Sequence, residues 1–206
     1  MLPVKQNICG LILAAGLSSR MNEFKPLMPL RKKTLIENAI DSVLSGGAGS
    51  ATVVIGYRGA ELETLLRRRY GELVQIVWNL EYDRTDMMHS IQIGCGALPE
   101  CEAFFLLPGD MPVVRRSTFE KLLQARREKQ SLVIFPTLKD WRKHPPLIDS
   151  GLIPEIQTFQ GPGGLRGLWQ WHEESIQTVP VDDEGVWIDL DTPKDYQLCR
   201  LQYEHK

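Results

Sequence analysis

The stretch Ile8–Lys25 reads ICGLILAAGLSSRMNEFK and changes character abruptly in its middle. Its apolar start, Ile8–Leu13, has the length and residue types of a strand. The small residues of Ala14–Ser19 then let backbone N–H groups come close to a ligand, and Arg20 and Lys25 bring two cations to the same edge. Amides that bind oxygens and cations that balance charge suit a triphosphate. The alternative is an ordinary strand-to-loop turn with two solvated basic residues.

Length and composition indicate one α/β-sized domain, residues 1–206, with a core large enough to need no disulfide. The formal net charge is −2, which gives no basic excess for nucleic acid as the main partner. The four cysteines form no CxxC pair and no Cys/His cluster with zinc spacing. Free thiols in a reducing cytosol are therefore expected, and the N-terminal apolar run is too short to span a membrane. We expect a cytoplasmic protein.

Apolar runs alternate with helix patterns along the chain. Several of the runs are continuously apolar, which is typical of strands covered on both faces of a mostly parallel sheet. This alternation predicts a doubly wound, three-layer α/β/α fold, whose ligands bind outside the carboxyl ends of the strands. The expected strands are Cys9–Leu13, Ala51–Ile55, Val74–Trp78, Ala103–Leu107, Leu132–Pro136, Ile176–Val181 and Val186–Leu190.

Local signals mark the helices between these strands. One apolar face runs from Leu35 to Leu44, and Gly46-Gly47 are expected to end that helix. Residues Ser117–Glu120 suggest a capping box for a helix that continues to about Lys129. Thr192-Pro193 supplies an N-cap and a first-turn proline for a last helix. The Pro/Gly-rich region around residues 137–170 is expected to be irregular and to face a substrate.

Two acidic segments also fall at predicted ends of strands. Asp110 lies in Pro108-Gly109-Asp110-Met111-Pro112, directly after the run Phe104–Leu107. Asp189 and Asp191 are two residues apart, so both carboxylates point to one side if the backbone is extended there. The ordinary alternatives are a turn aspartate for Asp110 and a helix-capping role for Asp191. Together with the cationic loop, the two segments predict a Mg²⁺-nucleotide site.

Four motifs in this order resemble a known family. They are LAAGLSSRM with the downstream Lys25, LPGDMP at 107–112, HPPLI at 144–148 and DLDTPKD at 189–195. This set, which covers nearly the whole chain, resembles the MobA/MocA-type nucleotidyltransferases and is most similar to the molybdenum cofactor cytidylyltransferase branch. The resemblance implies a Rossmann-like nucleotidyltransferase fold. It also implies transfer of CMP from CTP to the terminal phosphate of molybdopterin, with release of pyrophosphate.

The nucleobase expectation rests on Ala15. The guanylyltransferase branch of the family typically has LAGG where this chain has Leu13-Ala14-Ala15-Gly16. The methyl group of Ala15 would limit how a purine lies against the backbone, so a pyrimidine is favoured, with another NTP as the alternative. The residues expected to bind the nucleotide are Leu13, Ala14, Ala15, Gly16, Ser18, Ser19, Arg20, Lys25, Asn79 and Ser90.

Both the acceptor phosphate and the triphosphate are anionic, so catalysis calls for positive charge and alignment. We therefore predict that Arg20, Lys25 and Asp110 are the catalytic residues. Asp110 is the expected metal ligand, and Asp189 or Asp191 supplies a second carboxylate. Mg²⁺ is the expected metal, with Mn²⁺ as an alternative.

The base and acceptor sites carry weaker signals. The family has a similar Asn…Ser stretch near the nucleotide, but Ser90 has an equal claim to be the N-cap of the next helix. His144 lies in the stretch that resembles the family's acceptor-facing motif, so it is the candidate to bind the pterin or its phosphate. A histidine that only belongs to the loop is the alternative. Lys143 stands where many relatives have glycine, so the residue before His144 departs from the family pattern.

Three other functions compete with the cytidylyltransferase interpretation. The first is transfer of a nucleotidyl group to a sugar phosphate or another phosphorylated acceptor. The second is a non-catalytic protein that binds nucleotide or cofactor and delivers it to a molybdenum hydroxylase, a partner that the resemblance also implies. The third, a dinucleotide-dependent oxidoreductase, is disfavoured because the loop after the first strand lacks GxGxxG and no acidic residue ends the second strand.

Overall fold

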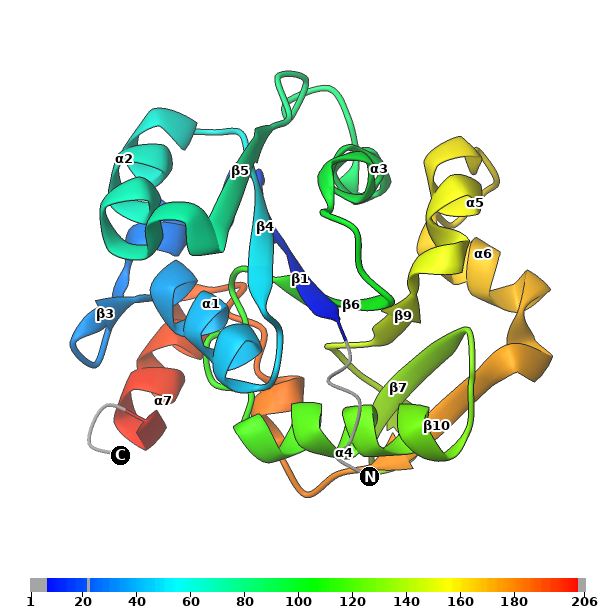
Figure 1. Ribbon diagram of the computed structural model, residues 1–206. Helices are drawn as coiled ribbons and strands as arrows, with labels where there is room; N and C mark the ends of the chain where they lie inside the picture. The colour runs from blue at the N-terminus through cyan, green and yellow to red at the C-terminus, as the bar shows by residue number, and fades with distance from the viewer. Residues whose placement is uncertain (1–6, 22, 204–206) are drawn as a thin grey trace.

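The computed structural model describes residues 7–21 and 23–203, and its sheet is built around the strand β1, Ile8–Ala14. β1 pairs in parallel with β4, Ser50–Ile55, on one side and with β6, Ala103–Pro108, on the other. The strand order in the eight-stranded sheet is β10-β7-β9-β6-β1-β4-β5, with β8 paired to β7 (Figure 1). The other strands of this sheet are β5 (Val74–Trp78), β7 (Val133–Leu138), β8 (Trp141–Arg142), β9 (Leu147–Asp149) and β10 (Ile176–Pro180).

Helices cover both faces of this sheet, as the apolar runs predict. Successive residues of β1 point to opposite faces: Ile8 and Ile12 join one buried cluster, and Cys9 and Leu11 join the other. The first cluster includes residues of α1, α2 and α4, and the second includes residues of α3, α5 and α6 (Figure 1). The three-layer α/β/α fold is therefore confirmed. The helices are α1 (Leu35–Ser45), α2 (Gly59–Tyr70), α3 (Met87–Ala97), α4 (Arg116–Glu128), α5 (Ile153–Thr158), α6 (Leu165–Trp171) and α7 (Pro193–Tyr203).

The sheet is mixed, because β9 runs antiparallel to both of its neighbours, β6 and β7. β9 is only three residues long, too short for its apolar pattern to stand out in the sequence. The region around residues 137–170, expected to be irregular, contains β8, β9, α5 and α6 joined by loops. A small separate hairpin is formed by β2 (Pro29–Leu30) and β3 (Lys33–Thr34). Single turns of 3₁₀ helix occur at η1 (Lys25–Leu27), η2 (Gly71–Leu73), η3 (Ser150–Leu152), η4 (Glu173–Ser175) and η5 (Glu184–Trp187).

Helix ends follow the sequence signals at α1 and α7. α1 has a capping box in which Thr34 and Glu37 each satisfy the other's backbone N–H, and it ends at Gly46 as expected. At α7, the Thr192 hydroxyl accepts a hydrogen bond from the Asp195 backbone N–H at 3.3 Å. The predicted N-cap at Thr192 is therefore confirmed. Within the described residues, no helix is long and apolar enough to cross a lipid bilayer.

Two predictions near α4 and η5 are wrong, and Asp183 explains the first. The expected capping box at Ser117 does not form; α4 begins at Arg116, and its N-cap, Arg115, makes no side-chain cap. The buried carboxylate of Asp183 instead accepts hydrogen bonds from the Arg115 backbone N–H at 2.7 Å and the Thr118 hydroxyl at 2.8 Å. It also accepts one from the Gly185 N–H at 2.9 Å, so a single carboxylate joins the start of α4 to η5.

The expected strand Val186–Leu190 is the second wrong prediction. Glu184–Trp187 forms the 3₁₀ turn η5, and the backbone then continues without regular structure to Asp191. The apolar residues of this segment are buried in different places, since Val186 joins the cluster under α4 and Leu190 joins a third cluster around α7. The segment is apolar because Val186 and Leu190 each pack into a different buried cluster, and not because it forms a strand.

We predict that Asp183→Ala lowers the free energy of unfolding by about 2 kcal/mol, because three donors, two of them in buried hydrogen bonds, lose their acceptor. Urea unfolding followed by circular dichroism measures the change. The neighbouring Asp182→Ala is the matched control, since the Asp182 side chain is 83% exposed. Equal midpoints for the two variants would contradict the assigned role of Asp183.

Candidate functional site

The loop that follows β1 closes on itself and then delivers Lys25 to the site. Ser18 has a positive φ of 54°, and its carbonyl accepts a hydrogen bond from the Met21 N–H at 2.9 Å. The Ser18 hydroxyl accepts another from the Lys25 backbone N–H at 3.2 Å. Ala14 and Ala15 are buried, whereas Gly16 is exposed and a Cβ added there would meet nothing within 4 Å. The expected phosphate-binding loop is therefore firmly anchored at its ends and open to a ligand at Gly16.

Lys25 lies at the centre of a cluster of charged residues. Its side chain is 10% exposed, and Nζ lies 3.2 Å from Oδ2 of Asp110 and 2.9 Å from Oδ1 of Asp191. The other carboxylate oxygen of Asp191 forms an ion pair with Arg20 Nη1 at 2.5 Å. Three distant parts of the chain meet here: the loop after β1, the loop after β6 and the approach to α7. The alternative in which Asp191 caps the last helix is wrong, because Thr192 and Asp195 form that cap.

Asp189 completes this cluster. One carboxylate oxygen from each of Asp110, Asp189 and Asp191 lies within 4.8 Å of the others. Leu190, between the two later aspartates, donates its backbone N–H to the Asp110 carbonyl at 3.4 Å, which ties the segments together. The two aspartates approach Asp110 although the backbone that carries them is not a strand. Their spacing therefore predicted the observed group of carboxylates, but the extended strand on which that prediction relied is absent from residues 188–191. We call Lys25, Asp110, Asp189 and Asp191 the acid cluster.

The protonation states in the acid cluster follow from these contacts. Burial disfavours the charged form of Lys25, but the hydrogen bonds and charges of Asp191 and Asp110 outweigh burial and raise its pKa. The pKa of Asp191 is lowered, since Lys25 and Arg20 overcome the effect of burial. Partial burial and the charges of Asp110 and Asp191 raise the pKa of Asp189 to about 6. Lys25 is therefore a permanent cation at neutral pH, and Asp189 is the carboxylate least compensated by positive charge.

The donor set of the acid cluster suits a divalent metal ion. Mg²⁺ and Mn²⁺ prefer oxygen ligands, and nucleotide-dependent sites commonly hold Mg²⁺ with one or two carboxylates together with phosphate oxygens. Three carboxylates close to one another provide such ligands, and only Arg20 and Lys25 form ion pairs with Asp110 and Asp191 among residues 7–21 and 23–203. The residues therefore fit the expected metal.

Asn79 and Ser90 lie together, but not as a helix cap. The Asn79 side chain is buried, and its Nδ2 donates to Ser90 Oγ at 3.0 Å and to Thr85 Oγ1 at 3.2 Å. The interpretation of Ser90 as an N-cap is wrong, because α3 begins at Met87 and Asp86 is its cap. The observed pair braces the segment between β5 and α3, and its contact with a nucleotide stays a prediction.

The sequence did not reveal an aromatic group beside this segment. Tyr57 donates its backbone N–H to the Ala15 carbonyl at 3.3 Å, and its ring makes an edge contact with Phe24 at 5.6 Å between centroids. Tyr82 packs against Gly56, where an added Cβ would lie 2.7 Å from the Tyr82 Cβ. These rings come from three separate loops, so no spacing in the sequence joins them. The backbone of Tyr57 places this group beside the loop after β1, and a contact with a nucleobase stays a prediction.

His144 precedes Pro145 in a cis peptide bond, and its ring is oriented by the backbone of β6. Nδ1 lies 3.3 Å from the Leu106 carbonyl oxygen, which can only accept, so Nδ1 carries the proton and Nε2 is an acceptor. Burial lowers the pKa of His144, with Arg166 and Lys143 adding to the effect and Asp110 opposing it. His144 is therefore neutral at pH 7, and its contact with an acceptor stays a prediction.

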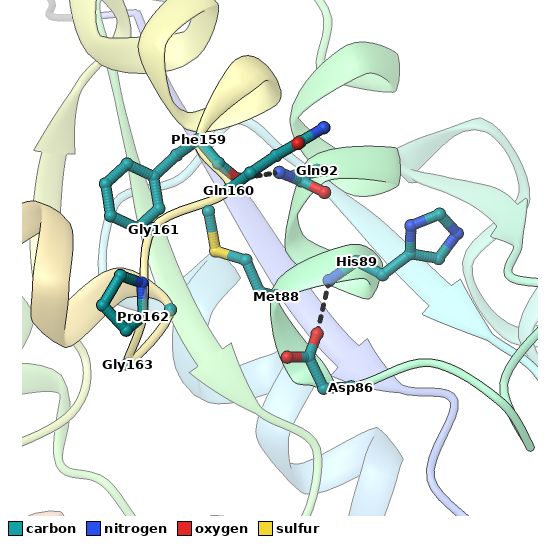
Figure 2. Close-up of a pocket in the computed structure, with 10 residues that line it drawn as sticks. Asp86, Met88, His89, Gln92, Phe159, Gln160, Gly161, Pro162 and Gly163 are labelled. Atoms are coloured by element: carbon teal, nitrogen blue, oxygen red, sulfur yellow. Dashed lines mark hydrogen bonds between the residues drawn. The ribbon is translucent and has the colours of Figure 1, made fainter.

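A separate hollow of ≈ 330 Å³ lies between the start of α3 and residues 159–164. Figure 2 shows Gln92 donating to the Phe159 carbonyl across this hollow and Asp86 accepting from the His89 backbone N–H. None of the three aspartates of the acid cluster lines it. The hollow adjoins α3, the helix that carries Ser90. The ion-paired lysine and carboxylates lie elsewhere, at the acid cluster.

Comparison with known protein families gives a match over residues 10–176 to the MobA-like NTP transferase domain. The chain belongs to this family. The matched residues include the loop after β1, Asp110 and His144, whereas Asp189 and Asp191 follow the match in the chain. The observed fold agrees with this membership.

Two curated relatives match nearly the full chain. The molybdenum cofactor cytidylyltransferase of Escherichia coli (strain K12) is 27% identical, with 94% of this chain and 95% of that protein covered. The nicotine blue oxidoreductase of Paenarthrobacter nicotinovorans is 28% identical, with 94% and 96% covered. Relatives with two different activities thus share this degree of similarity.

Solved structures show the same fold. A nucleotidyl transferase from Methanothermobacter superposes with a TM-score of 0.81 at 23% identity, covering 97% of this chain and 98% of that one. Rv0371C of Mycobacterium tuberculosis H37Rv, solved as a complex with manganese, superposes with a TM-score of 0.74 at 19% identity, covering 95% and 98%. The predicted Rossmann-like nucleotidyltransferase fold is therefore confirmed.

Asp189 should give the protein a measurable pH dependence. Its pKa is about 6 in the folded chain against an ordinary value of 3.8, so the folded state binds more protons between these values and its stability falls as pH rises through them. In EDTA, we expect Asp189→Asn to raise the free energy of unfolding by about 1 kcal/mol near pH 7.5, after allowance for solvent screening.

This gain should disappear as the pH is lowered through 6 toward about 4, where the wild-type carboxyl is already protonated. Urea titrations at a series of pH values measure it, with the exposed Asp83→Asn as the matched control. A gain that stays constant with pH, or that Asp83→Asn reproduces, would contradict the raised pKa.

Proposed function

We propose that this protein is a nucleotidyltransferase that transfers CMP from CTP to the terminal phosphate of molybdopterin and releases pyrophosphate. The observation that carries the proposal is the meeting of Lys25, Arg20 and three carboxylates at the open end of the loop after β1. The family membership supports the reaction class, and the 27% identity to a molybdenum cofactor cytidylyltransferase supports the substrates.

In the proposed reaction, an oxygen of the acceptor phosphate attacks the α-phosphorus of CTP. A new P–O bond forms as the bond to the β-phosphate oxygen breaks, and pyrophosphate leaves with that electron pair. No proton needs to be removed from a phosphate dianion, so the site has to supply charge compensation and alignment. Lys25 stays protonated and cannot serve as a general base, and the reaction as written requires none.

Each residue of the site has a distinct part in this proposal. The amides of residues 15–19 bind the triphosphate, and Arg20 and Lys25 hold positive charge beside the reacting phosphorus. Asp110, with Asp189 or Asp191, would hold Mg²⁺ or Mn²⁺, whose charge lowers the repulsion between the two anions and stabilises the leaving pyrophosphate. Because the raised pKa keeps Lys25 protonated, it acts through its charge and not by moving a proton.

Other acceptors and roles remain as alternatives. A sugar phosphate or another phosphorylated compound would use the same charge arrangement, and an accessory protein for a molybdenum hydroxylase would bind the same ligands without turnover. An oxidoreductase is the second candidate, because the 28% identity to nicotine blue oxidoreductase favours it. Redox chemistry gives no reason for three carboxylates around a lysine, so we rank nucleotidyl transfer first.

Pyrophosphate release tests the proposal. With Mg²⁺ and molybdenum-loaded molybdopterin, we expect release with CTP above ATP, GTP and UTP, and none without the pterin. Asp110→Ala should lower the rate by at least about a hundredfold, since loss of one electrostatic contact of this kind costs roughly 3 kcal/mol. The exposed carboxylate Glu174, changed to Ala, is the matched control and should leave the rate unchanged.

Circular dichroism of Asp110→Ala should show an intact fold. Near-normal turnover in that variant would contradict the role of Asp110. Absence of pyrophosphate with every nucleotide, together with pterin- or dye-dependent oxidation of NAD(P)H, would replace the proposal with the oxidoreductase. Nucleotide binding without either reaction would favour the accessory role.

The nucleobase expectation has its own test. Ala15→Gly removes the methyl group that we expect to exclude a purine, so the ratio of kcat/KM for CTP over GTP should fall by about tenfold, within the range of one methyl group in a binding pocket. The measurement is pyrophosphate release with each nucleotide under the same conditions. Ala14→Gly is the control beside it. An unchanged ratio in Ala15→Gly would show that another part of the site selects the base.

A further inference from the structure

Trp187 lies two residues before Asp189 and is held in place by the turn η5. Asp183 accepts from the Gly185 N–H in this turn, and Gly185 packs directly against the backbone of the loop that follows Asp110. A Cβ added at Gly185 would lie 2.2 Å from the Val113 carbonyl oxygen, so η5 packs closely against this backbone. Trp187 is nevertheless 51% exposed. A large aromatic residue is thus held two positions before Asp189 without being buried.

Lys143 reaches this ring from a distant part of the chain. It lies between β8 and β9, next to His144, and its backbone N–H donates to the Pro136 carbonyl at 2.8 Å. Its Nζ is 3.3 Å from the centroid of the Trp187 ring. An ammonium over an indole face is attracted by the negative face of the ring. Two segments that are distant in the sequence therefore meet here through a cation and an aromatic ring.

The charge of Lys143 has no carboxylate partner in the part of the chain that the structure describes. No ion pair joins it, or Arg166, to Asp or Glu among residues 7–21 and 23–203. Burial lowers the pKa of Lys143, and both Lys143 and Arg166 act on the neighbouring His144. Lys143 is thus a half-buried cation beside His144 that lies over an aromatic ring and has no carboxylate partner among the described residues. Such cations gain most from an anionic ligand.

We propose that Lys143 and Trp187 form the subsite that selects the acceptor, and that the acceptor is a planar heterocycle carrying a phosphate. This inference rests on the proposed function and specifies its acceptor side. Lys143 binds the phosphate and holds it toward Asp110, while the exposed part of the Trp187 indole stacks against the ring. Lys143 and Trp187 bind and orient the acceptor, whereas the acid cluster binds the nucleotide.

A ligand with both features would contact both side chains. A sugar phosphate would use Lys143 but leave the exposed part of the indole in water, and an uncharged ring would leave Lys143 with only its contact to the Trp187 ring. Stacking on an aromatic side chain and a charge-assisted contact with phosphate each typically change affinity by about tenfold or more. The two contributions can therefore be separated with probes that carry only one feature.

Direct binding of three probes tests the subsite. Neopterin monophosphate has the ring and the phosphate, neopterin has the ring alone, and ribose 5-phosphate has the phosphate alone. Isothermal titration with Mg²⁺ should show that the wild type binds neopterin monophosphate most tightly. Trp187→Leu should weaken neopterin monophosphate and neopterin by about tenfold and leave ribose 5-phosphate unchanged. Lys143→Gln should weaken the two phosphorylated probes by about tenfold and leave neopterin unchanged.

Matched variants separate this role from general damage. Trp187→Phe should restore most of the ring affinity, while Trp171→Leu, at another exposed tryptophan, and Lys129→Gln should behave as wild type. The Kd for CTP should be the same in every variant. Three results would overturn the subsite. They are wild-type protein that binds no probe, the same pattern of probe affinities in Trp187→Leu and Lys143→Gln, and a loss of CTP affinity that parallels the loss of probe affinity. Failure of pyrophosphate release with the probe pattern intact would instead overturn the proposed transfer reaction alone.

Discussion

The ion pairs of Lys25 with Asp110 and Asp191 are the interaction on which the site depends. Lys25 is brought by the loop after β1, and the two carboxylates come from the loop after β6 and the approach to α7. Without a cation between them, the three nearby carboxylates would repel one another. Lys25 therefore holds the three segments together, and its charge is already present where a triphosphate is expected to bind. A bound triphosphate would change the partners of the Lys25 ammonium and would not need to bring a new charge into the site.

The central part of the fold could be predicted from local patterns because β1, β4 and β6 are buried along nearly their whole length and lie in mostly apolar runs. The prediction failed where burial has another cause. Val186 and Leu190 are buried in two different clusters, so their apolar character produces no strand. The three-residue β9 enters the sheet in the antiparallel direction, which only its tertiary neighbours determine. Local sequence gives residue types, but sheet order and short insertions follow from distant contacts.

The sequence was sufficient to predict which residues belong to the candidate site, but not which of them form ion pairs. Arg20, Lys25, Asp110, Asp189 and Asp191 each follow an apolar run, which is a local signal. That Lys25 lies between two of these carboxylates follows from the order of β6, β1 and β4 in the sheet and from the packing of α7. Asp183 and the Lys143–Trp187 contact had no such signal, because each joins segments that are far apart along the chain. The sequence also suggested a capping motif at Ser117 and a cap at Ser90. The tertiary contacts of Asp183 replace the first, whereas Asp86, close by in the sequence, caps α3 in place of the second.

A direct count of bound metal tests the central claim, that the acid cluster and the loop after β1 form one metal–nucleotide site. Electron paramagnetic resonance of free Mn²⁺ measures its binding with and without CTP. We expect one Mn²⁺ per chain in the presence of CTP, tighter binding of each ligand when the other is bound, and a loss of at least about tenfold in Mn²⁺ affinity in Asp110→Asn. Mn²⁺ binding that does not depend on CTP and is unchanged in Asp110→Asn would contradict it.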